Sequence, residues 1–256
     1  MNLKFNAELA KEYKSPSQQA RVLTEDWVRH NIYCPNCGND ELNKYCDNKP
    51  VADFYCSKCK EDYELKSKKG TIGNIVMDGE YNKKMERLKE ANNPNLLLLN
   101  YDKSRYEVLN FYVIPRFYFV PDIIVKRKPL SSNAKRAGWI GSNILLNKIP
   151  DSGKIALIEN SSIFLKKKVL FSWEKVSFLK EQKELKTKGW ILDIMNCIDK
   201  LDKKEFSLNE IYSFERSLMQ KHPENKHIKD KIRQQLQVLR DKNYLKFVGN
   251  GEYRLI

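Results

Sequence analysis

Two pairs of closely spaced cysteines constrain this chain more than any other feature of its sequence. Cys34-Pro-Asn-Cys37 and Cys56-Ser-Lys-Cys59 are separated by eighteen residues. This spacing fits the Cys-x2-Cys-x15–20-Cys-x2-Cys pattern of tetrahedral zinc sites, in which both thiolates of a pair reach one ion at about 2.3 Å. Four cysteine ligands leave no open position on the metal, so the predicted zinc is structural and not catalytic.

The other two cysteines, Cys46 and Cys197, lie outside these pairs and are expected to be bystanders. Six cysteines of which four form two closely spaced pairs fit metal binding in a reducing compartment better than a disulfide framework. The amino-terminal stretch has no uninterrupted apolar core of a signal peptide, and no apolar run approaches the ~18–20 residues needed to cross a bilayer. The expectation is a cytoplasmic protein without a membrane segment.

The charge balance points towards a polyanionic partner. The formal net charge is +14 and the pI is about 9.3. Basic runs recur at Lys66–Lys69, Lys126–Lys128 and Lys166–Lys168, which favours nucleic-acid binding. The alternative is a lysine-rich chain with solvated surfaces, and charge alone says nothing about chemistry or base sequence.

The first two thirds of the chain predict an α/β core. A length of 256 residues favours one large domain plus a small one. Apolar periodicity and turn residues indicate helices alternating with short, partly apolar strands. The predicted elements are a helix over 16–30, strands over 51–55 and 63–68, a charged helix over 79–93, and strands over 95–101 and 106–115.

The pattern breaks between residues 121 and 150. This stretch is basic and predicted to be loop-like, with Gly138 and Gly141 flanking Trp139 and Ile140. An exposed apolar pair on such a loop is unusual, and the alternative is that Trp139 fills the core. Beyond it we expect strands over 155–158 and 162–165, and then a connecting helix over 173–188.

The carboxy-terminal segment predicts a winged helix-turn-helix. A helix over 190–200, one that begins at the capping box Ser207-Leu-Asn-Glu210, one over 226–241 and a hairpin with a Gly-Asn-Gly tip follow in order. The third helix would present side chains of the types that contact guanine and adenine edges. These are Lys229, Arg233, Gln234 and Gln237. The alternative is a helical interaction module without base contacts.

A candidate catalytic pattern lies around the second cysteine pair. Asp53 precedes Glu64-Leu65-Lys66 on the next predicted strand. Because side chains alternate along a strand, Glu64 and Lys66 face one side and Leu65 faces the core. Two carboxylates on adjacent strands suit Mg2+. A lysine beside them can orient a water or help deprotonate it, and can stabilise the charge that develops on the phosphate. This is the PD-(D/E)xK nuclease arrangement. The alternative is a surface salt-bridge set of little energetic value.

Several long segments make the chain similar to a known family. "VADFYC", "ELKSKKG", "NNPN", "RAGWIG" and "KIRQQLQVLRDK" stand in it with their spacing preserved. On these segments the chain resembles the DpnI-like methyl-directed type II (type IIM) restriction endonucleases of the PD-(D/E)xK superfamily, over nearly its whole length.

The resemblance implies a fold and a reaction. The fold is an α/β (α+β) PD-(D/E)xK nuclease core with a structural zinc site over residues 1–185, followed by a winged helix-turn-helix over 186–256. The implied activity is Mg2+-dependent cleavage of double-stranded DNA at GATC sites that contain N6-methyladenine, leaving 5′-phosphates. The expectation is a monomer.

The resemblance also implies residue roles. Asp53, Glu64 and Lys66 would be catalytic, with Mg2+ held by Asp53, Glu64 and the Leu65 carbonyl. Trp139 and Arg136 would contact the methylated adenines. Two alternatives remain open: a non-catalytic zinc and winged-helix regulator, and an RNA-processing nuclease.

Overall fold

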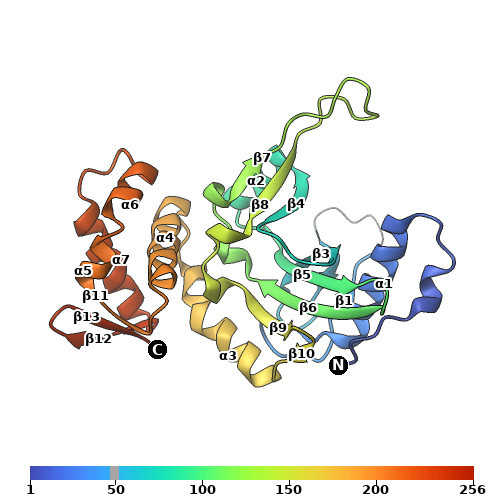
Figure 1. Ribbon diagram of the computed structural model, residues 1–256, viewed down its shortest axis with the longest axis horizontal. Coiled ribbons are helices and arrows are strands. Elements are labelled where there is room, and N and C mark those ends of the chain that lie inside the picture. The colour runs from blue at the N-terminus through green and yellow to red at the C-terminus, as the bar shows by residue number, and fades with distance from the viewer. Residues whose placement is uncertain (47–51) are drawn as a thin grey trace.

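The computed structural model describes residues 1–46 and 52–256 and is shown in Figure 1. Two parts lie next to each other: an α/β part that holds both cysteine pairs, and a carboxy-terminal part of helices with a small sheet. The mixed α/β fold class with a carboxy-terminal helix-turn-helix is therefore confirmed.

A seven-stranded mixed sheet forms the centre of the α/β part. Its strand order is β1-β2-β3-β5-β6-β9-β10, and β3 and β5 are the parallel pair in it. Antiparallel pairing joins the other neighbours. The strand bounds are β1 Asn43–Lys44, β2 Phe54–Tyr55, β3 Asp62–Lys69, β5 Asn95–Asp102, β6 Glu107–Ile114, β9 Ile155–Glu159 and β10 Ser162–Ile163. The predicted strand over 51–55 begins in a stretch, 47–51, that lies outside the described residues.

Apolar side chains from both faces of this sheet form the main core. The predicted first helix is present as α1 (Pro16–Asn31), and its Trp27 packs edge-on against Phe111 of β6 with ring centroids 5.5 Å apart. Leu96, Leu97, Leu98 and Leu99 of β5 are all buried, as expected for a central strand that is covered on both faces. Helix α3 (Lys166–Val176) packs against β9.

The prediction of a loop over 121–150 was right for residues 127–140 and wrong on both sides of them. Strands β7 (Ile124–Lys126) and β8 (Gly141–Leu145) pair with β4 (Ile75–Glu80), which the sequence did not predict, in a second sheet of order β4-β8-β7. The predicted charged helix follows β4 as α2 (Tyr81–Lys89). Between β7 and β8 the chain forms a long arm that projects from the body in Figure 1; we call residues 127–140 the arm.

Short 3-10 helices connect these elements. They are η1 Ala7–Ala10, η2 Arg116–Tyr118, η3 Pro121–Ile123, η4 Leu146–Lys148, η5 Asp151–Gly153 and η6 Ser177–Glu181. The predicted connecting helix over 173–188 was also wrong, because α3 ends at Val176 and η6 follows it.

The carboxy-terminal part has the order of a winged helix. Its elements are α4 Leu185–Leu201, β11 Glu205–Ser207, α5 Leu208–Tyr212, α6 Glu215–Lys221, α7 Ile228–Asp241, β12 Leu245–Gly249 and β13 Glu252–Leu255. The capping box is present, with Ser207 and Glu210 satisfying each other's backbone amides at the start of α5. The predicted second helix is divided into α5 and α6, and β11 was not predicted. Ile228, Ile232, Leu236 and Leu239 of α7 are buried, as predicted.

Backbone and side-chain hydrogen bonds join the two parts. The Asn196 amide of α4 donates to the Lys148 carbonyl at 2.8 Å, and the Asp151 N–H donates to the Asp199 carboxylate at 2.8 Å. Within residues 1–46 and 52–256, the helices are too short or too polar to cross a membrane.

Candidate active site, zinc centre and DNA-binding surfaces

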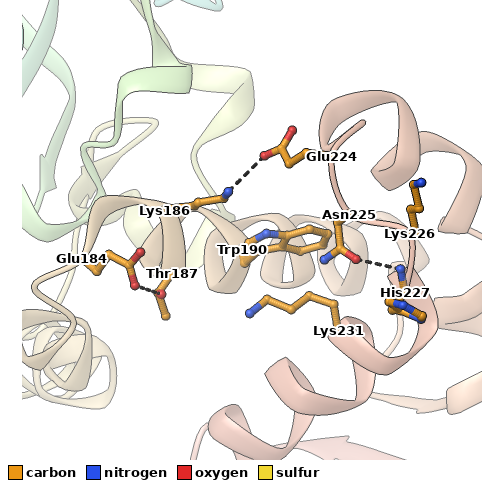
Figure 2. A pocket seen from close by; sticks show the side chains of 9 residues that line it. All are labelled: Glu184, Lys186, Thr187, Trp190, Glu224, Asn225, Lys226, His227 and Lys231. Carbon is orange, nitrogen blue, oxygen red and sulfur yellow. Dashed lines mark hydrogen bonds and ion pairs between the residues drawn. The ribbon is translucent and has the colours of Figure 1, made fainter.

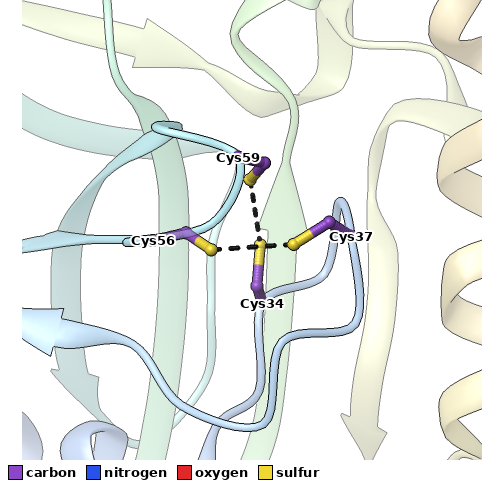
Figure 3. Close-up of side chains that lie close together, drawn as sticks. All are labelled: Cys34, Cys37, Cys56 and Cys59. Carbon is purple, nitrogen blue, oxygen red and sulfur yellow. Dashed lines mark hydrogen bonds between the residues drawn. The ribbon is translucent and has the colours of Figure 1, made fainter.

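The four predicted zinc ligands lie together. Cys34 Sγ lies 3.5 Å from Cys59 Sγ, and Cys37 Sγ lies 3.6 Å from Cys56 Sγ, with all four sulfurs within 4.8 Å of one another (Figure 3). Sulfurs bound to one tetrahedral zinc at about 2.3 Å would be about 3.8 Å apart. The cluster therefore has the size and the donor chemistry to hold zinc, and its cysteines are free thiols and not disulfides.

Both cysteine pairs adopt the same local turn. The Gly38 N–H donates to the Cys34 carbonyl at 2.9 Å, and the Lys60 N–H donates to the Cys56 carbonyl at 3.0 Å. Gly38 and Lys60 occupy the left-handed region, with φ of 74° and 60°. Glycine adopts this conformation without steric cost, whereas it is uncommon for lysine. The matched turns point all four sulfurs at one place.

Asp53 is held against the middle of β3. Its N–H donates to the Tyr63 carbonyl at 2.9 Å, and its Oδ2 accepts from the Leu65 N–H at 2.7 Å. In a β-strand the N–H and C=O of one residue point to the same edge. The Leu65 carbonyl therefore faces the edge of β3 where the Asp53 carboxylate lies.

Glu64 and Lys66 form a ring of four charges with two residues that the sequence did not predict, Asp78 of β4 and Lys84 of α2. Lys66 Nζ lies 2.6 Å from Glu64 Oε1 and 3.0 Å from Asp78 Oδ1. Lys84 Nζ lies 2.8 Å from Asp78 Oδ2 and 3.8 Å from Glu64 Oε2. The side chains of Asp78 and Lys84 are only 3% and 7% exposed, so this is not a surface salt-bridge set.

The environment changes the proton affinities of these groups. Burial lowers the pKa of Lys66, but the carboxylates of Glu64 and Asp78 outweigh it and raise the pKa above its ordinary value. Burial raises the pKa of Asp53, and burial together with the neighbouring Asp78 raises that of Glu64. Burial also acts to raise the pKa of Asp78, but Lys84 and Lys66 hold it well below the usual range. Lys66 is therefore an ammonium.

No local signal in the sequence identified Asp78. Ile75, Val76 and Met77 are all apolar, so the sequence lacks the period-two alternation of a strand with one covered face. The alternation appears in the structure, where Ile75 and Met77 are exposed and Asp78 is buried. No local signal distinguishes Lys84 from the other lysines of α2 either.

The arm carries Trp139 and Arg136. The Leu130 N–H donates to the Trp139 carbonyl at 2.9 Å, and the Arg136 guanidinium lies over the Trp139 ring, 4.6 Å from its centroid. Trp139 is half-buried and not part of the hydrophobic core, so the alternative that it fills the core is wrong. A Cβ on Gly141 would lie 2.8 Å from the Trp139 ring, so the ring covers this glycine closely.

The four predicted side chains of α7 are all exposed: Lys229, Arg233, Gln234 and Gln237. Arg233 donates to the Tyr212 hydroxyl at 2.7 Å and pairs with Asp230. Lys229 lies 3.5 Å from Glu215. These contacts orient the two cations on the outer face of the helix.

A cavity of about 590 Å³ lies beside the start of α7 (Figure 2). Its wall includes Lys186, Lys226 and Lys231, and Trp190 of α4 lies between the elements that line it. Lys186 pairs with Glu224 at 3.2 Å. The cavity belongs to the winged-helix part and contains no residue of the Asp53 site.

Comparison with known families covers nearly the whole chain. Residues 1–182 match the DpnI family, which is described as the Dam-replacing family. Residues 186–255 match the DpnI carboxy-terminal family, described as the Dam-replacing HTH domain. The two matched segments correspond, in the same order, to the α/β part and the carboxy-terminal part of the structure.

Proposed function

Since this chain belongs to the DpnI family of methyl-directed restriction enzymes, we propose that it hydrolyses double-stranded DNA at GATC sites that contain N6-methyladenine. The reaction depends on Mg2+ and leaves 5′-phosphate and 3′-hydroxyl ends. The observation that carries this proposal is the convergence of Asp53, Glu64 and Lys66 on β3, in a chain with a net charge of +14.

The oxygen atoms around β3 fit a magnesium ion. Two partly desolvated carboxylates, Asp53 and Glu64, and the Leu65 carbonyl at the same strand edge give a donor set made only of oxygen, which Mg2+ prefers. When bound there, Mg2+ would neutralise charge on the scissile phosphate and lower the pKa of the attacking water.

The protein groups position the reactants. The Lys66 ammonium orients the water for in-line attack and stabilises the charge that develops on the phosphate oxygens. The water oxygen forms the new bond to phosphorus and releases a proton to solvent. The bond from phosphorus to the 3′ oxygen breaks, and that oxygen takes up a proton from solvent to give the 3′-hydroxyl. Because this proposal places one such centre in each chain, a double-strand break takes either two chains or two successive nicks.

Trp139 and Arg136 are proposed to read the methyl groups. Burying one methyl group contributes only about 0.8 kcal/mol, roughly a factor of four. A fully methylated GATC site offers two methyl groups, so this contribution doubles. A flat apolar wall such as Trp139, held by Arg136 and packed over Gly141, disfavours the unmethylated site further, because the contact is then badly packed and wet.

The winged helix is proposed as a second DNA-reading unit. The proposed boundary lies between residues 185 and 186, at the start of α4. The exposed Lys229, Arg233, Gln234 and Gln237 would enter the major groove, and Lys226 and Lys231 beside the start of α7 would contact phosphates. We propose a cytoplasmic monomer. Because both DNA-binding parts belong to one chain, binding by one part raises the effective concentration of DNA at the other.

A plasmid digestion assay tests this function. One plasmid is prepared with and without adenine methylation at GATC and incubated with the protein in Mg2+ or in EDTA. Cleavage of the methylated plasmid in Mg2+ alone is expected. If neither plasmid is cut while methyl-dependent binding persists, the protein is instead a non-catalytic DNA-binding regulator.

A further inference from the structure

Asp78 and Lys84 are the most buried charges around the proposed active site, and neither has a role in the chemistry described above. We propose that Asp78 is a positioning residue that holds the Lys66 ammonium in place during catalysis, and that Lys84 holds Asp78. The inference rests on the proposed function of Lys66, because a lysine without a catalytic role would not need positioning.

Lys66 has two carboxylate partners, of which only one, Glu64, is also a proposed metal ligand. Glu64 is shared between Lys66 and the proposed Mg2+, so a bound metal weakens its hold on the ammonium. Asp78 lies 3.0 Å from Lys66 on a different sheet and is not one of the proposed metal ligands. It therefore remains a partner for Lys66 when Glu64 turns towards the metal.

Asp78 is itself fixed in position. Its other oxygen lies 2.8 Å from Lys84, and its strand pairs with β8, where Asp78 lies opposite Ser142. The Ser142 hydroxyl donates to the Gly79 carbonyl at 3.0 Å. Lys84 lies 5.2 Å from the centroid of the Phe119 ring, which favours a cation at this point. The carboxylate is thus held from two sides.

Stability alone does not account for this arrangement. Removing charges from water costs several kcal/mol per ion, and a buried ion pair often stabilises a fold no better than apolar residues of similar volume. A role in orienting Lys66 gives these charges a function that apolar residues could not supply.

A double-mutant cycle with Lys66 tests the inference. In the otherwise wild-type protein, Asp78→Asn should lower the single-turnover cleavage rate of methylated duplex in Mg2+ by about 10–100-fold, as supporting residues of metal sites do. In a Lys66→Ala background the same substitution should change the rate by less than about two-fold, the scatter seen for unrelated changes. Equal losses in both backgrounds, or no loss in the first, would overturn the proposal.

A second readout needs neither metal nor cleavage. In metal-free protein labelled at the lysine ε-carbon, the Lys66 signal is identified by its absence in Lys66→Arg. The readout uses a Glu64→Ala background, in which Asp78 remains as the carboxylate partner of Lys66. In this background Lys66 should be as rigid as Lys84, and it should become as mobile as the exposed Lys69 when Asp78→Asn is added. An equally rigid Lys66 after that addition would contradict the proposal. The same readout settles the question if Lys66→Ala cleaves too slowly for the double-mutant cycle.

Asp193→Asn serves as the matched control. Asp193 is also buried and pairs with two cationic or protonatable groups, Lys221 and His222, but it lies on α4. The Asp193→Asn variant should have a lower free energy of unfolding than the wild-type protein, but its Lys66 should stay rigid. If Asp78→Asn does not fold, Asp78→Glu takes its place: it keeps the charge and should retain a rigid Lys66, with loss of rigidity counting against the inference. An inactive wild-type protein would refute the proposed function, while the lysine signals would still test the positioning contact.

Discussion

Lys66 lies between the carboxylates of Glu64 and Asp78, and this position determines its charge. Burial lowers its pKa, but the two carboxylates outweigh that effect and keep the group protonated. An ammonium has no lone pair with which to accept a proton. The side chain therefore suits orientation of water and stabilisation of negative charge, and not general-base catalysis.

Substitution of Trp139 tests its proposed role in reading the methyl groups. We expect Trp139→Ala to reduce the ratio of cleavage rates on methylated and unmethylated duplex by about 4-fold to 15-fold, since one or two methyl contacts of about 0.8 kcal/mol each are lost. The rate on methylated DNA at saturation should fall less. Parallel single-turnover measurements on the two duplexes give this ratio.

Trp139→Phe is the control for this prediction. It keeps an aromatic surface over Gly141 and should retain most of the preference for methylated DNA. Equal loss of cleavage on both duplexes in Trp139→Ala would mean that the ring supports the arm and does not read methyl groups.

Local patterns predicted part of this residue-level picture. The placement of Asp53, Glu64 and Lys66 around β3 could be predicted, because strand alternation and one neighbouring strand bring them together. Asp78 and Lys84 could not, because their contacts with β3 depend on how β4 and α2 pack against a different sheet. The number of residues between them in the sequence does not indicate that packing.

The paired cysteine turns join α1 and the start of the main sheet. The sequence correctly predicted that the four cysteines lie together, because the ligand spacing within each turn is local. By contrast, β4, β7 and β8 were missed. Their short apolar stretches are interrupted by charged and glycine residues, and only pairing between segments distant in sequence makes them a sheet.

Zinc content and stability test the cysteine cluster. The purified protein should contain one zinc per chain, and Cys37→Ser should lose it. The melting temperature should then fall by on the order of 10 °C, because loss of several kcal/mol shifts Tm by about 2–4 °C per kcal/mol in a domain of this size. Metal analysis and calorimetry measure both quantities.

Cys46→Ser supplies the comparison for Cys37→Ser. Cys46 is exposed and lies outside the group of four sulfurs, so its substitution should leave zinc content and Tm unchanged. Full zinc content in Cys37→Ser would show that the four sulfurs do not hold the metal together.

On the scale of the whole molecule, we propose two surfaces for DNA: the α/β part with its arm, and the winged helix. The prediction of this order of parts was right because the capping box, the apolar faces of the helices and the Gly-Asn-Gly hairpin are all local signals. The conformation of the chain before the proposed boundary was not predicted: the sequence favoured one continuous helix over 173–188, whereas η6 and residues 182–184 separate α3 from α4.

If the winged helix is a second DNA-binding surface, substitutions on it should weaken DNA binding and leave the cleavage rate at saturation unchanged. We expect the double change Lys229→Ala and Arg233→Ala to raise the DNA concentration for half-maximal cleavage by about ten-fold or more, since each outward cation on the recognition helix contributes to binding. The cleavage rate at saturating DNA should stay the same. Titrations at two salt concentrations should also show a shallower salt dependence.

Arg240→Ala with Lys242→Ala removes the same charge from the other end of α7. Both side chains lie at the carboxy-terminal end of α7, away from the start of the helix that is proposed to enter the major groove. Like Lys229 and Arg233, they pair with acidic neighbours, Asp241 and Glu181. The control therefore removes comparable charges and should leave half-maximal cleavage nearly unchanged. The same loss in both double variants would mean that net charge, and not the exposed face of α7, drives binding.

The measurement that tests the central claim most directly compares the wild-type protein with Lys66→Ala on one methylated GATC duplex. Binding is measured in Ca2+, and cleavage is then started with Mg2+. Lys66→Ala should bind as the wild-type protein does and cut at least about 100-fold more slowly. Lys69→Ala, an exposed change on the same strand, should cut normally. Undiminished cleavage by Lys66→Ala would contradict the assignment of the nuclease centre to β3.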